Sequence, residues 1–199
     1  DWCSVSCYDD FIRSGEKMKL KKVSNIKMKL KKVPNIKKYV RKLDPGGEWL
    51  IMFEIEVANR EVQPNCHYLY DDNRKPPLDI AINPEDGMLE YITYFAQDET
   101  IEHISTVPVI VSEDTGISIS IDDFDKDYPS YITEEKSFKF WYSGNTIFVL
   151  KDGIEGSTLT GYKLNNSDSL LFLEDEFVGI EFKNMSQEEM TEIRNAKIL

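Results

Sequence analysis

The residues that most suggest chemistry are four acids with a regular spacing. They stand where a twelve-residue calcium loop has oxygen ligands, at positions 1, 3, 5 and 12, and they are Asp123, Asp125, Asp127 and Glu134. The sixth position, which needs glycine for a sharp turn, is Tyr128. We keep the four acids as candidate calcium ligands. The simpler interpretation is an acidic turn in contact with water.

A second candidate is a cysteine nucleophile with a histidine base. Cys66 and His67 are adjacent, and neighbouring residues of a strand point to opposite faces of its sheet. A working pair would therefore need Cys66 beside His103, the other histidine of the chain. We expect Cys66 to be a small buried apolar side chain instead. The sequence holds no complete catalytic motif and no glycine-rich loop for phosphate.

Charge is divided unevenly along the chain. Residues 1–42 carry 13 Lys and Arg against 4 Asp and Glu, whereas residues 43–199 carry 11 against 32. A body with this acidic excess repels nucleic acid and anionic membranes and attracts basic proteins. The alternative interpretation is that the acids hydrate a β surface and keep its edges from pairing. We expect a basic protein as partner, with no nucleic acid and no membrane.

Composition indicates a folded protein of a reducing compartment. The 199 residues are 41% hydrophobic, which suffices for a core without disulfide or metal staples. The three cysteines do not form a disulfide framework, and Cys3 and Cys7 lack the second ligand pair of a zinc site. We find no secretory signal and no apolar run that could span a bilayer. The expectation is a cytoplasmic protein with no cofactor besides the candidate calcium.

A tandem copy of ten residues lies in the basic amino-terminal extension, residues 1–42. MKLKKVSNIK at residues 18–27 is followed by MKLKKVPNIK at residues 28–37, a pair too short for a repeat architecture. Its apolar residues are three or four apart, which favours a helical stripe. Pro34 and the β-branched side chains oppose that helix.

The residues before the tandem copy resemble the product of a non-coding upstream region that has been translated together with the gene. SGEKM at residues 14–18 can be encoded by a purine-rich stretch like a bacterial ribosome-binding site followed by a start codon. We therefore interpret residues 1–17 as an upstream extension, with a natural start at Met18 or Met28. The lysine-rich residues 17–42 are expected to pack on the acidic surface of the protein as a helix or an edge strand.

From residue 43 onward, turn signals alternate with short strands of period two. A strand is expected at 49–57 and another at 66–70. Four hairpins are expected, which pair 80–82 with 89–95, 107–111 with 117–121, 146–150 with 158–162, and 170–173 with 177–182. These elements predict a mostly antiparallel, β-rich acidic domain at 43–199, in one piece or as two lobes, 43–105 and 106–199.

Helix is scarce in the sequence. Ser186 and Glu189 have the spacing of a capping box, so residues 187–197 are expected to form a short helix packed on the sheet. A weaker helical turn is expected at 97–104. The predicted fold class is α+β, with antiparallel hairpins or curved sheets and a carboxyl-terminal helix.

One stretch of the body has a characteristic order of parts: a tyrosine, a strand that begins x-T, an acidic turn, a G-I-E strand and a serine. In this chain the parts are Tyr142, Asn145–Leu150, Glu174–Phe177, Gly179–Phe182 and Ser186. The order resembles a small bacterial domain family of unknown function, over about residues 140–186, although Glu176 and Phe177 replace the turn glycine of the family. The resemblance implies a hairpin fold and a bacterial origin, and it brings no activity.

These observations predict a non-enzymatic bacterial protein that binds a basic protein on an acidic sheet surface. A toxin-neutralising immunity protein is the most specific form of this hypothesis, because charge complementarity steers such association. The alternative is a hydrolase that uses a metal ion or paired carboxylates near residues 122–127. A third interpretation is an assembly role through exposed strand edges.

Overall fold

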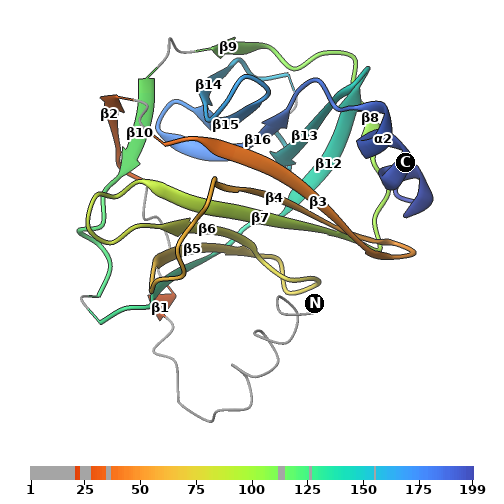
Figure 1. The fold of residues 1–199 in the computed structure, drawn as a ribbon. Coiled ribbons are helices and arrows are strands. Elements are labelled where there is room, and N and C mark those ends of the chain that lie inside the picture. Colours follow the sequence, from red (N-terminus) through yellow and green to blue (C-terminus); the bar gives the residue numbers. More distant parts are fainter. Residues whose placement is uncertain (1–20, 23–27, 35–36, 112–114, 126, 155) are drawn as a thin grey trace.

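Two seven-stranded sheets pack face to face in the part of the chain that the structure describes (Figure 1). The computed structural model describes residues 21–22, 28–34, 37–111, 115–125, 127–154 and 156–199. The expected upstream extension, residues 1–17, lies outside the described residues together with Cys3 and Cys7.

The first sheet has the strand order β1-β11-β5-β6-β7-β4-β3. Its strands are β1 (Lys21–Lys22), β3 (Tyr39–Gly47), β4 (Leu50–Val57), β5 (Cys66–Asp71), β6 (Leu78–Ile82), β7 (Leu89–Gln97) and β11 (Ser130–Glu135). The strands β3, β4, β7, β6 and β5 pair antiparallel in that order, and β11 pairs with β5 in parallel. In β4, Ile51, Phe53 and Ile55 are buried and the residues between them are half-buried, as its period-two sequence predicts.

The second sheet has the strand order β8-β12-β13-β16-β15-β14-β9. Its strands are β8 (Glu102–His103), β9 (Val109–Val111), β12 (Phe138–Ser143), β13 (Thr146–Lys151), β14 (Leu159–Lys163), β15 (Asp168–Leu173) and β16 (Glu176–Phe182). A small second core lies on its outer face, where Leu150, Leu171 and Val178 are covered by Ile104 and Val107 of the β8–β9 connection. This sheet is therefore buried on both faces.

Two smaller elements lie at the ends of the sandwich. β2 (Leu30–Pro34) and β10 (Thr115–Ile119) pair antiparallel at the left of Figure 1. At the other end, α2 (Gln187–Asn195) begins with the expected capping box of Ser186 and Glu189. Its Met190 and Ile193 join the core that both sheets share, so the prediction of a carboxyl-terminal helix packed on the sheet is confirmed.

The predicted fold class is confirmed in its coarse form, because strands dominate and α2 is the one helix among the described residues. The hairpins β6–β7 and β15–β16 are confirmed. The other two are wrong: β9 pairs with β14 and β10 with β2, while β13 lies between β12 and β16. A period-two pattern shows which face a residue takes, and long-range packing selects the partner strand.

One helical expectation is also wrong. Residues 97–104 hold the short strand β8, because β8 adds to the edge of β12 in parallel. For the second tandem copy a helix or an edge strand was expected, and the structure has the strand β2, since β-branched side chains and Pro34 suit an edge strand better than a helix.

The domain boundaries of the sequence analysis fall among these strands. Residue 42 lies within β3, so the basic extension continues into the first sheet. Residues 43–105 supply most of the first sheet and residues 106–199 most of the second. β11 returns to the first sheet and β8 belongs to the second, so the sheets exchange strands across residue 105.

Aromatic side chains fill the space between the sheets. The ring of Phe53 lies 4.9 Å from that of Phe140 and 5.3 Å from that of Phe182, centroid to centroid. Tyr94 meets Phe140 edge to face at 4.8 Å. Since such pairs add to the free energy of burial, these rings join the layers into one core.

Two groups of ion pairs join elements of the sandwich. On the inner face of β3, Arg41 donates to Asp168 Oδ1 of β15 at 2.5 Å and to Glu189 Oε1 of α2 at 2.8 Å. Asp168 is 1% exposed, and its burial raises its pKa although Arg41 opposes that shift. Elsewhere, Lys136 of the β11–β12 connection and Lys151 at the end of β13 each lie 2.7 Å from Oε1 of Glu176, at the start of β16.

We predict that Arg41→Ala lowers the free energy of unfolding by about 3–5 kcal/mol, because it leaves the Asp168 carboxylate buried without its cation. Adding Asp168→Asn should restore part of the loss, since it removes that charge. Lys42→Ala is the matched control: its exposed ammonium pairs with Glu56 on the outer face and should cost about 0–1 kcal/mol. Urea unfolding of the three variants measures this. Equal losses in Arg41→Ala and Lys42→Ala would contradict the prediction.

Candidate functional site: the outer face of the first sheet

Residues that lie opposite one another in neighbouring strands share a face of the sheet. One row on the outer face of the first sheet crosses five strands, from Glu56 through Tyr91, Ala81 and His67 to Tyr131. This row therefore sets three aromatic rings and a carboxylate side by side, with a small alanine between Tyr91 and His67.

The rows beside it are rich in acids. The next row runs from Glu54 through Thr93, Asp79 and Leu69 to Thr133. The acids that the described strands place on this face are Asp44, Glu54, Glu56, Asp71, Asp79 and Glu135. Against them, β3 contributes Lys42. We call this acid-rich and aromatic surface the outer face.

Asp79 is the hydrogen-bonding centre of the outer face. Its Oδ1 lies 2.9 Å from Nδ1 of His67, and its Oδ2 accepts the hydroxyl of Tyr91 at 3.1 Å. The imidazole of His67 stacks on Tyr131 with 4.9 Å between ring centroids. These contacts fix the orientation of the aromatic row, because a carboxylate that holds one imidazole nitrogen also holds the plane of the ring.

A cation already uses this surface. The guanidinium carbon of Arg60, in the β4–β5 connection, lies 4.3 Å above the ring centroid of Tyr91. The Arg60 Nε is 3.4 Å from Oε2 of Glu56. An aromatic ring beside a carboxylate is a favourable environment for a guanidinium group, so the outer face is chemically suited to basic side chains.

The electrostatics of the outer face also suit basic side chains. Burial, and then the neighbouring Glu56, raise the pKa of Glu54 despite the opposing Lys42 and Arg60. Burial and the charge of Asp79 raise the pKa of Tyr91 and of Tyr131. Each raised pKa reflects lost hydration or the negative potential of neighbouring acids. A cation that approaches the outer face reduces that negative potential.

The structure does not bring together the candidate nucleophile and base. Cys66 faces the core and is 0% exposed, while His67 lies on the opposite face of β5, as the strand geometry predicts, and is 8% exposed there. His103 lies on β8 of the second sheet, where its ring meets Tyr142 at 5.2 Å. Burial raises the pKa of the Cys66 thiol to about 11, which disfavours the nucleophilic thiolate.

The candidate calcium ligands are spread over a turn and a strand. Asp123 lies 3.1 Å from Lys29, and Glu134, on β11, lies 3.1 Å from Lys136. Asp125 and Asp127 are exposed in the preceding turn. Among the described residues no group of three or more His, Cys, Asp or Glu side chains could hold a metal ion. Calcium binding by these acids stays a prediction.

Sequence reasoning missed the Asp79–His67–Tyr91 network. The signal was present in the alternation of β6 and β7, where Asp79 stands half-buried between Leu78 and Ile80, and Tyr91 stands half-buried between Glu90 and Ile92. Their meeting with His67 depends on the antiparallel register of β5, β6 and β7. A sequence shows the outward positions and leaves that register open.

Comparison with protein-family models and with curated proteins finds no match to this chain. The resemblance of residues 140–186 to a bacterial domain family therefore stays a hypothesis. No helix among the described residues has the length and apolar character required to cross a membrane.

We predict that Cys66 is unreactive in the folded protein. In a variant with Cys3→Ser and Cys7→Ser, the thiol should react with Ellman's reagent at least about 100-fold more slowly than after unfolding in urea, because a buried, high-pKa thiol is neither accessible nor ionised. The absorbance of the released thiolate measures both rates. Rapid reaction in native buffer would show that Cys66 is accessible and would reopen the cysteine–histidine hypothesis.

Proposed function

We propose that this protein binds a basic protein on the outer face of its first sheet, without chemical turnover. The observation that carries the proposal is the outer face itself, where acids surround a row of oriented aromatic rings. Acids steer a basic partner and raise its association rate, whereas aromatic side chains supply the buried anchors of an interface.

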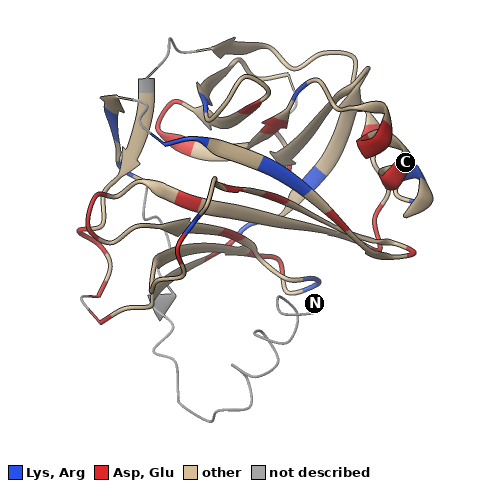
Figure 2. Ribbon diagram, in the orientation of Figure 1, with Lys and Arg blue, Asp and Glu red and all other residues tan. Residues whose placement is uncertain are grey.

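The two sheets differ in what lies over them. The second sheet has its outer face covered by the β8–β9 connection, which buries apolar side chains there. On the first sheet, half-buried polar and aromatic residues alternate with the core positions of β4 and β7. Figure 2 shows acids along the edges and turns of the first sheet and on α2. We place the partner on the first sheet, because Glu56, Tyr91 and Tyr131 of its outward row are half-buried, although His67 and Ala81 between them are buried.

A toxin-neutralising immunity protein is the specific form that we propose for this binding. Such a protein needs a preformed acidic surface, rapid association and no catalytic centre. The described residues offer the first of these, and the buried, high-pKa Cys66 offers little to a cysteine enzyme. A bacterial, cytoplasmic setting belongs to the same proposal.

Charge reversal on the outer face tests the proposal. Glu54→Lys with Glu135→Lys should weaken capture of the basic partner at least about tenfold, because it turns the acids that meet the partner into repelling cations. Glu85→Lys with Asp175→Lys is the matched control, with the same change in net charge in exposed turns. Immobilised wild-type and variant proteins are incubated with native lysate at low and high salt, and the bound proteins are identified by mass spectrometry.

The expected result is one basic protein that the wild type and the control retain at low salt and the outer-face variant loses. Retention should also fall at high salt, where exposed charges are screened. Absence of any basic protein at low salt would contradict the proposal. Equal loss in both variants would assign the effect to net charge and would also contradict it.

A further inference from the structure

The arginine on the outer face is held more loosely than the arginine between the sheets. Arg41 makes short contacts, among them Asp168 Oδ1 at 2.5 Å and Glu189 Oε1 at 2.8 Å, and its side chain is 10% exposed. The Nε of Arg60 lies 3.4 Å from Oε2 of Glu56, which is longer than a normal N–H···O hydrogen bond, and its side chain is 25% exposed. Arg41 is therefore a fixed part of the fold, whereas Arg60 is placed where it can be exchanged.

The groups that hold Arg60 are themselves held by the sheet. The ring of Tyr91 lies 4.3 Å from the guanidinium carbon of Arg60, and its hydroxyl donates to Asp79 Oδ2 at 3.1 Å. Asp79 is in turn fixed by His67 at 2.9 Å. Glu56 lies opposite Tyr91 in the ladder of β4 and β7. We call the ring of Tyr91 and the carboxylate of Glu56 the arginine site, and its shape does not depend on Arg60.

Arg60 can leave the arginine site without opening the core. It lies in the β4–β5 connection, where residues 61–64 are exposed and Val62 is 98% exposed. The backbone N–H of Arg60 donates to the carbonyl oxygen of Val57 at 3.1 Å, so rotation of the side chain alone carries the guanidinium group away. That rotation uncovers Tyr91, which is not part of the shared core.

We propose that the arginine site recognises an arginine side chain of the basic partner, and that Arg60 is an internal substitute which the partner's arginine displaces. The inference rests on the function proposed above. A guanidinium group suits the site better than an ammonium group does, because its planar face stacks on Tyr91 while its edge donates to Glu56.

The internal substitute makes the outer face selective. Any ligand must first displace Arg60, so its apparent affinity is reduced by the fraction of molecules in which the arginine site is occupied from within. An isolated cation gains little beyond what Arg60 already gains. A basic protein also meets Asp44 and Glu54 on the same face, and these further contacts offset the displacement. The arginine site therefore discriminates against small cations.

Peptide binding tests the displacement. The probe is fluorescein-labelled hexa-arginine, and fluorescence anisotropy at low salt measures its dissociation constant. Arg60→Ala should bind this peptide at least about fivefold more tightly than the unchanged chain, because the arginine site is then free.

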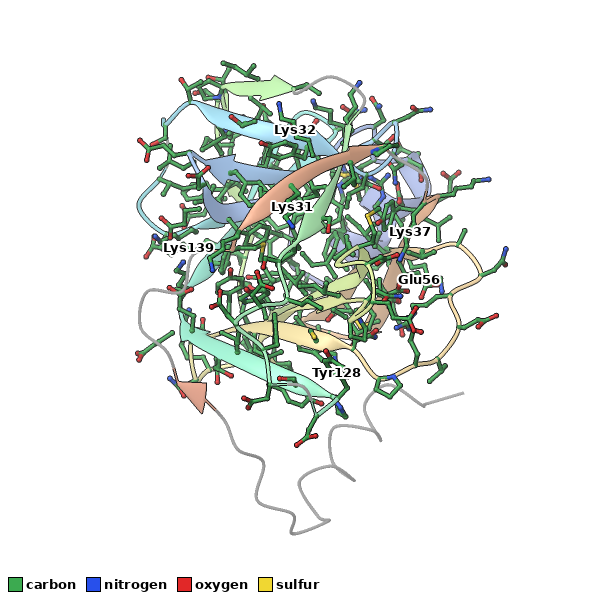
Figure 3. All side chains as sticks on the ribbon, turned by 90° about the vertical axis from the view of Figure 1, so that its left-hand side faces the viewer. Lys31, Lys32, Lys37, Glu56, Tyr128 and Lys139 are labelled. Carbon is green, nitrogen blue, oxygen red and sulfur yellow. The ribbon has the colours of Figure 1, made fainter. Side chains whose placement is uncertain are left out.

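Lys139→Ala is the matched control for charge. It removes the same charge from an exposed lysine of β12 that pairs with Asp152, and Figure 3 shows Lys139 and Glu56 at opposite sides of the view. This variant should change binding of hexa-arginine by less than about twofold, because exposed charges at a distance are screened. An Arg60→Ala chain that binds hexa-arginine no more tightly than the Lys139→Ala chain would overturn the proposal.

The ring of Tyr91 should account for a preference for arginine over lysine. In the Arg60→Ala chain, hexa-arginine should bind at least about threefold more tightly than hexa-lysine, a peptide of equal charge. Adding Tyr91→Phe, which keeps the ring, should keep this preference. Adding Tyr91→Leu, which removes the ring, should make the two peptides bind equally. A preference for arginine that survives Tyr91→Leu would count against the arginine site.

Displacement can also be followed in the unchanged chain by NMR. The Nε–Hε signal of Arg60 is shifted by the nearby ring of Tyr91. It should move to the position of a solvent-exposed arginine as unlabelled hexa-arginine is added to the isotope-labelled protein. A signal that stays in place while the peptide saturates the protein would show that Arg60 keeps the site, and it would contradict the proposal.

The outcomes separate this inference from the proposed function. Capture of a basic protein that depends on Glu54 and Glu135, with no effect of Arg60→Ala on hexa-arginine, would leave the proposed function in place and refute the arginine site. Tighter binding of hexa-arginine by the Arg60→Ala chain, with no basic protein retained from the lysate, would support the arginine site and contradict the proposed function.

Discussion

The arrangement of the two sheets depends on a cation placed between them. Arg41 projects from the edge strand β3 toward the second sheet, where Asp168 and Glu189 hold its guanidinium group. A buried carboxylate without a cation is strongly unfavourable, so the sheets cannot slide along this edge without separating the charges. Glu176 of β16 also joins Lys151 of β13 to Lys136 of the β11–β12 connection. The aromatic rings between the sheets then pack in one arrangement.

Because the inner face and the edges carry stability, the outer face of the first sheet is free to carry another role. Glu54 and Glu56 are neighbours on that face. Burial first, and then Glu56, raise the pKa of Glu54, while Lys42 and Arg60 oppose the shift. Our proposal is that a basic partner adds further cations beside the oriented aromatic rings.

Local chemistry was readable from the sequence, and long-range pairing was not. The capping box of Ser186 and the short acidic turns of β6–β7 and β15–β16 act within a few residues, so the sequence predicts them correctly. The partners of β9, β10, β13 and β14 are chosen by packing between distant segments, and those predictions failed. The candidate site divides in the same way. Strand geometry alone separates Cys66 from His67, whereas the contact of His67 with Asp79 needs the register of two strands.

The uneven charge of the chain first suggested a basic partner. Only the acids that the chain's own cations do not neutralise can support that proposal. Part of it is neutralised internally, because the basic extension pairs with the acidic body through Lys29 and Asp123, Lys37 and Glu90, and Arg41 and Asp168. Those acids are bound to the chain's own cations and are not available to a partner. On the outer face, Glu56 is likewise paired with Lys42 and Arg60, but β3 to β7 and β11 also place Asp44, Glu54, Asp71 and Glu135 there. The argument for binding therefore depends on where the acids lie in the sheet, and the net charge of −12 is not sufficient evidence by itself.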